Sequence, residues 1–111
     1  MKSINVKEEL LKEIKLCGLK LSIHSRERML QRGYTQKDIA RVLLTGMVIK
    51  EKSDKFGWEI TILGKDVGNS PCIAIFGRRY AYSKEINLVT IMPPVATKYQ
   101  SLITKLYENV A

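Results

Sequence analysis

The sequence is poor in the residues that hold most protein-bound metals and that build disulfide frameworks. It contains two cysteines and one histidine. Cys17 and Cys72 are far apart in the chain and form no Cys-x-x-Cys pair, so a zinc site cannot be assembled from this inventory. We therefore interpret both cysteines as free, buried thiols. No metal site and no other cofactor is expected.

Long apolar runs are also missing. No run approaches the roughly 18 residues that a membrane-spanning helix needs. Lysines and glutamates interrupt the first segment, where a signal peptide has a continuous apolar core. We expect a soluble protein with no membrane partner that works in a cytoplasm, either of the cell that makes it or of a target cell into which it is delivered.

Acidic residues are few relative to basic ones. The chain has 11 Asp and Glu against 19 Lys and Arg, which gives a formal charge of +8. A positive charge of this size attracts the phosphate backbone of a nucleic acid, and it equally suits an acidic protein. An anionic partner is therefore expected, and RNA is the first candidate.

The chain has 111 residues, of which 45% are hydrophobic, and this predicts a single globular domain over residues 1–111. Ser22 is suited to cap a helix that ends at Gly33, and Thr35 with Asp38 starts another helix that ends at Gly46. Helical spacing of apolar residues predicts further helices over 4–17, before Gly18, and over 95–110.

Between Gly46 and Pro93 the pattern changes to β-branched and aromatic runs separated by short turns. The predicted strands cover residues 47–52, 58–63, 72–82 and 86–92. Short turns join antiparallel neighbours, so a four-stranded meander is the simplest arrangement. The predicted fold class is α+β, with short N-terminal helices packed on a four-stranded antiparallel sheet and a C-terminal helix.

The only histidine, His24, shares a helix face with Arg28 and Arg32, at i, i+4 and i+8 over about 12 Å. Cleavage of a phosphodiester in RNA needs a base, an acid and fixed positive charge beside the phosphate. One imidazole and two guanidinium groups supply most of that set. The same pattern is also typical of a solvated helix whose arginines pair with neighbours such as Glu27.

A second basic motif lies in the third predicted strand. If Arg78, Tyr80 and Tyr82 share a face, they place a cation beside two stacking rings and form a platform for single-stranded RNA. Strand alternation allows only one of Arg78 and Arg79 to face a given ligand. Alternatively, the tyrosines line the edge of the core with their hydroxyl groups in water.

The stretch LSIHSRERMLQRGYTQKDI, followed by LLTGMVI, resembles the bacterial domain-of-unknown-function family 4258 (DUF4258). The resemblance covers about residues 19–93, which leaves the helices over 4–17 and 95–110 as extensions. Members of this family look like distant relatives of the barnase, colicin and RelE-like ribonuclease toxins. By that resemblance His24, Arg28 and Thr90 are the expected catalytic residues, with Arg32 beside them as an RNA contact.

The resemblance implies a metal-independent ribonuclease toxin that cleaves RNA through attack by a 2′-hydroxyl group. His24 would act as base or acid, Arg28 would hold the phosphate and Thr90 would orient it. A basic site without a long gating loop also leads us to expect an acidic antitoxin or immunity protein as a partner.

Two readings without catalysis remain open at this point. Residues 26–41 resemble a helix-turn-helix, although the second helix offers few side chains that read bases. A phage or mobile-element protein that binds nucleic acid or inhibits a host protein would use the same basic surface.

Overall fold

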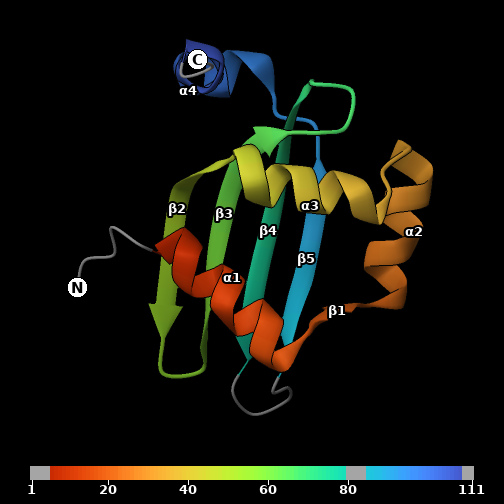
Figure 1. Ribbon diagram of the computed structural model, residues 1–111, viewed down its shortest axis with the longest axis vertical. Helices are drawn as coiled ribbons and strands as arrows, with labels where there is room; N and C mark the ends of the chain where they lie inside the picture. The colour runs from red at the N-terminus through yellow and green to blue at the C-terminus, as the bar shows by residue number, and fades with distance from the viewer. Residues whose placement is uncertain (1–5, 80–84, 109–111) are drawn as a thin grey trace.

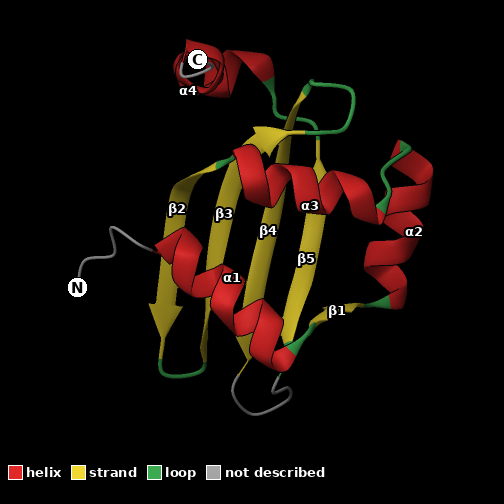
Figure 2. Cartoon of the chain, viewed as in Figure 1, coloured by secondary structure: helices red, strands yellow, loops and turns green. Residues whose placement is uncertain are grey.

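The computed structural model of the chain describes residues 6–79 and 85–108. The elements are α1 (Val6–Cys17), β1 (Leu19–Leu21), α2 (Ile23–Arg32), α3 (Gln36–Thr45), β2 (Met47–Asp54), β3 (Gly57–Lys65), β4 (Pro71–Arg79), β5 (Ile86–Met92) and α4 (Ala96–Glu108). Helices and strands build an α+β fold around one sheet, as the sequence predicts (Figure 2).

Within the described residues the sheet has five strands, in the order β1-β5-β4-β3-β2. Strands β2 to β5 form the predicted antiparallel meander. The prediction of a four-stranded, purely antiparallel sheet is wrong, because β1 pairs in parallel with β5 from Ile86 to Leu88. Leu19, Lys20 and Leu21 do alternate in the sequence, but three residues are too few to predict a strand. The two strands are also far apart in the chain, so no local sequence pattern indicates that they pair.

Capping side chains set the ends of the helices, and the predicted boundaries of α2 and α3 are confirmed. The Ser22 hydroxyl accepts a hydrogen bond from the backbone N–H of Ser25 at 3.0 Å. Gly33 ends α2 with φ +77°, a conformation that glycine adopts without steric cost. At the start of α3 the Asp38 carboxylate accepts the N–H of Thr35 at 2.8 Å. The outermost residues predicted for the two terminal helices, 4, 5, 109 and 110, lie outside the described residues.

Helices α1 and α3 cross one face of the sheet, which we call the covered face (Figure 1). The core beneath them contains Leu10 of α1, Val42 of α3 and the strand residues Ile62 and Phe76, all nearly inaccessible to water. The end of α3 lies so close to β3 that a Cβ on Gly46 would come within 2.4 Å of the Ile62 side chain. A glycine is therefore required where the chain leaves α3 for β2.

The opposite side of the sheet, which we call the open face, is covered at one end by α4. A smaller core there joins Leu63 and Ile73 to Leu106 of α4. Lys50 is exposed at the edge of the area that α4 covers, and farther along the same face the side chains of Lys52 and Arg79 are exposed. Among the described residues no helix covers this part of the sheet.

Candidate nucleic-acid interface

Helix α2 is attached to the edge of the sheet by two hydrogen bonds to β5. The buried Ser25 hydroxyl donates to the carbonyl oxygen of Leu88 at 2.6 Å. At the C-terminal end of α2, Nη1 of Arg32 donates to the carbonyl oxygen of Ile91 at 2.7 Å. Strand β1 pairs with β5 only as far as Leu88. Beyond that residue, α2 lies along the edge of β5.

The two flanks of α2 point to opposite faces of the sheet. Arg26 lies on the flank nearest α3, where its Nε donates to the carbonyl oxygen of Leu21. Arg32 lies on the other flank and reaches Thr90. Residues are about 100° apart around a helix, so His24 and Arg28 fall on the flank of Arg32. The predicted series therefore borders the open face.

The structure brings together some of the predicted site residues. Nη1 of Arg32 lies 3.5 Å from Oγ1 of Thr90, which is half-buried. His24 is exposed and Arg28 is half-buried, and no contact joins either of them to Thr90 within the described residues. The resemblance predicts that Arg28 is catalytic and that Arg32 is an RNA contact. In the structure it is Arg32 that lies beside Thr90.

Strand register places a row of four side chains across the open face. Lys50 on β2 is paired with Thr61, Thr61 with Ile75, and Ile75 with Thr90. Paired residues share a face, so the row runs from Lys50 to the contact between Thr90 and Arg32. We call these four residues the cross-strand row. With strands about 4.8 Å apart, the row is about 14 Å long and has a cation at each end.

Residues 21–93 match the family described as Domain of unknown function (DUF4258). The match covers more than half of the chain. The chain belongs to the DUF4258 family. No curated protein and no solved structure matches it. The matched residues hold α2 and Thr90, whereas α1 and α4 of this DUF4258 protein lie outside them.

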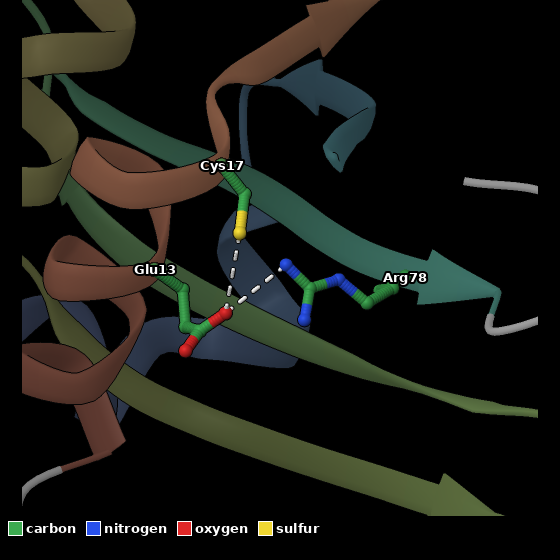
Figure 3. A network of polar contacts seen from close by, with 3 residues as sticks. All are labelled: Glu13, Cys17 and Arg78. Carbon is green, nitrogen blue, oxygen red and sulfur yellow. Dashed lines mark hydrogen bonds and ion pairs between the residues drawn. The ribbon is translucent and has the colours of Figure 1, made fainter. Parts of the chain in front are cut away.

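Arg78 faces the covered side of the sheet, under α1 (Figure 3). Its Nη2 lies 3.0 Å from Oε1 of Glu13, and the side chain is only 18% exposed. The pair is not aligned as a hydrogen bond, and Nε and Nη2 have no hydrogen-bond acceptor within the described residues. The Cys17 thiol also lies 3.8 Å from this Glu13 oxygen.

This placement bears on the predicted RNA platform. Tyr80 and Tyr82 lie outside the described residues, so their position beside Arg78 stays a prediction. Arg78 would have to exchange Glu13 for a phosphate in order to bind RNA. By strand alternation Arg79, not Arg78, shares the open face with Thr90.

Two weakly acidic groups lie in the core of the covered face, the buried thiol of Cys72 and the half-buried phenol of Tyr34. The two side chains lie beside one another. Burial raises the pKa of the Cys72 thiol to about 11, and burial with the adjacent Cys72 raises the pKa of Tyr34 strongly. Both groups are neutral near pH 7, and both lie in the core of the covered face, on the other side of the sheet from the cationic flank of α2.

Within residues 6–79 and 85–108, no three His, Cys, Asp or Glu side chains gather where a metal ion would be held. None of the helices seen in this part of the chain has the length and apolarity to cross a membrane.

Sequence reasoning missed the lysines of the open face. Lys50 and Lys52 alternate with Glu51 and Ser53, and this period-two pattern was the available signal. The pattern does not say which set faces the helices. Only the position of α1 in the fold decides that Glu51 and Ser53 face the covered side and that Lys50 and Lys52 face the open side.

Proposed function

We propose that this DUF4258 protein binds RNA on the open face of its sheet and cleaves it by attack of a 2′-hydroxyl group on the adjacent phosphate. The observation that carries the proposal is the anchored guanidinium of Arg32. Its contacts to Ile91 and Thr90 both use Nη1. The donors on Nε and Nη2 are therefore left to bind a phosphate, in a side chain that is already held in place.

The charges across the open face support a nucleic-acid ligand. Lys50, Lys52 and Arg79 project from the same face; two acids lie among them, Glu59 at 3.8 Å from Lys52 and Asp54 at the far end of β2. A strand that follows the cross-strand row would have cations beside its backbone at both ends. Such a basic sheet face suits single-stranded RNA better than a duplex.

The roles of the α2 side chains follow from their spacing. Arg28 lies about 6 Å along the helix from both His24 and Arg32. A phosphate held by the two arginines places the 2′-hydroxyl group next to His24. His24 removes the hydroxyl proton, the 2′-oxygen bonds to phosphorus, and the bond to the 5′-oxygen breaks as water protonates that oxygen. The products are a 2′,3′-cyclic phosphate and a free 5′-hydroxyl end.

An acidic antitoxin or immunity protein is the partner that fits this proposal. The open face is basic, and a partner with acidic side chains would occupy the phosphate positions along it. Opposite charges would speed association, so we expect the on-rate to fall as salt increases. Bacteria that express the chain without such a partner are expected to stop growing.

The proposal is tested with end-labelled RNA in EDTA, comparing wild type with His24→Ala. We expect cleavage to fall about 100-fold or more in His24→Ala, with unfolding free energy changed by less than about 1 kcal/mol because His24 is exposed. Glu27→Ala, on the outer side of the same helix, is the matched control and should cleave normally. Expression of wild type or Glu27→Ala should arrest bacterial growth, and expression of His24→Ala should not.

A substrate with one 2′-deoxy position sharpens the assay. Wild type should not cut at the deoxy position, and the cut ends elsewhere should carry a cyclic phosphate. Cleavage at the deoxy position, or equal cleavage by His24→Ala, would reject the mechanism. RNA that is bound and left intact would favour a non-catalytic binding protein.

A further inference from the structure

A small pocket lies between α4 and the open face of the sheet, with a volume of about 230 Å³. Ile73, Ile75 and Met92 line its apolar side, and Tyr99 and Leu102 line it from α4. Lys50 and Lys98 also line it. We call this the α4 pocket.

The α4 pocket adjoins the proposed phosphate position. Ile75 in its wall is the register partner of Thr90, and Lys50 and Thr61 of its lining belong to the same cross-strand row. A ligand in the pocket is therefore about one strand spacing from Thr90. One nucleotide chain could occupy both places.

The shape of α4 brings an aromatic ring to this pocket. Tyr99 has non-helical backbone angles, φ −115° and ψ +15°, inside α4. The helix is therefore kinked at the residue that faces the pocket. The ammonium group of Lys98 lies 5.3 Å from the centre of the Tyr99 ring, so a ring and a cation are presented together.

The lining suits an aromatic ring that is attached to an anionic group. Drug-sized ligands occupy pockets of about 300–1,000 Å³, so 230 Å³ leaves room for one ring system and not for two stacked nucleotides. Two lysines and no acid line the pocket, which favours an anion. Apolar walls beside a tyrosine favour an aromatic ring. A nucleotide combines both properties.

We infer that the α4 pocket holds one nucleobase of the bound RNA, next to the phosphate at Arg32 and Thr90. The inference rests on the proposed function and adds a base-selecting site to it. Because α4 lies outside the residues that match DUF4258, this selectivity belongs to the C-terminal helix of this chain and not to the family module. Stacking on Tyr99 supplies affinity, and the fixed volume of the pocket discriminates between bases.

The test uses non-cleavable 2′-O-methyl hexanucleotides of A, C, G and U, with an abasic hexanucleotide as the backbone-only probe. At least one base-bearing probe should bind wild type about tenfold more tightly than the abasic probe. Tyr99→Leu should reduce that probe to the abasic affinity. Tyr107→Leu, the same change on α4 at a residue that does not line the pocket, should keep the preference. Methyl resonances of Ile75 and Met92 should shift with the preferred probe.

The two proposals fail in different ways. If wild type binds all five probes equally, or if Tyr107→Leu loses the preference as fully as Tyr99→Leu, the pocket inference is overturned while RNA binding stands. Binding to none of the probes at low salt overturns the proposed function, and the base site with it. A preferred probe that leaves the Ile75 and Met92 methyl resonances unmoved places the base elsewhere and also rejects the pocket.

Discussion

The two faces of the sheet have opposite surroundings. The covered face is packed under α1 and α3, and acids of α1 and β2 lie around its rim, with Glu13 paired to Arg78. The open face is packed against α4 at one end, and beyond that end it presents lysines, Thr90 and the anchored Arg32. One face holds the fold together and the other is left for a ligand.

Adjacent arginines show what this difference means for a single residue. Arg78 and Arg79 have the same chemistry and differ by one position, yet the pleat sends them to opposite faces. Arg78 becomes part of the packing between α1 and the sheet, whereas Arg79 is exposed on the open face, four residues along β4 from Ile75 of the cross-strand row. Net charge therefore overstates the basic surface that RNA can reach, and the faces must be considered separately.

The largest expected effect concerns the helix over the covered face. Leu10 is 2% exposed in the main core, so Leu10→Ala should lower the unfolding free energy by about 2–4 kcal/mol. Leu16→Ala changes a side chain of the same helix that is 80% exposed and should cost less than about 0.5 kcal/mol. Urea unfolding measures both. Equal, small losses would show that α1 is not part of the folded core.

A smaller effect concerns pH and the buried thiol of Cys72. The folded state holds the pKa of Cys72 at about 11, above the ordinary value of 9.0, mainly because the thiol is buried. The unfolded chain therefore loses this proton first, and stability should fall as pH rises from about 9 toward 11, by about 2 kcal/mol. Tyr34, whose pKa is also raised by burial, adds a loss of the same sign.

Unfolding by urea at a series of alkaline pH values tests this effect. Cys72→Ala should lose some stability near neutral pH, because a buried side chain is removed, but its decline above pH ~9 should be shallower than that of wild type. Parallel pH curves for the two proteins would contradict the assignment of the alkaline loss to Cys72.

The features that local chemistry determines were predictable from the sequence. Hydrogen bonds of Ser22 and between Thr35 and Asp38 determine where α2 and α3 begin, and they join residues only three positions apart. Short turns between the strands determine the meander. The contact between Arg32 and Thr90 joins residues 58 positions apart, so no local pattern in the sequence predicts it. Strand alternation separates Arg78 from Arg79, but only the packing of α1 decides which of them is covered.

The most direct test of the account asks which face binds RNA. Lys50→Gln removes a charge from the cross-strand row, and Lys12→Gln removes the same charge from the exposed side of α1 over the covered face. The measurement is the affinity for a single-stranded RNA over a range of salt concentrations. We predict that Lys50→Gln reduces the slope of log affinity against log salt by about 0.7 and that Lys12→Gln leaves it unchanged. A reduced slope in Lys12→Gln with a wild-type slope in Lys50→Gln would contradict the open-face account.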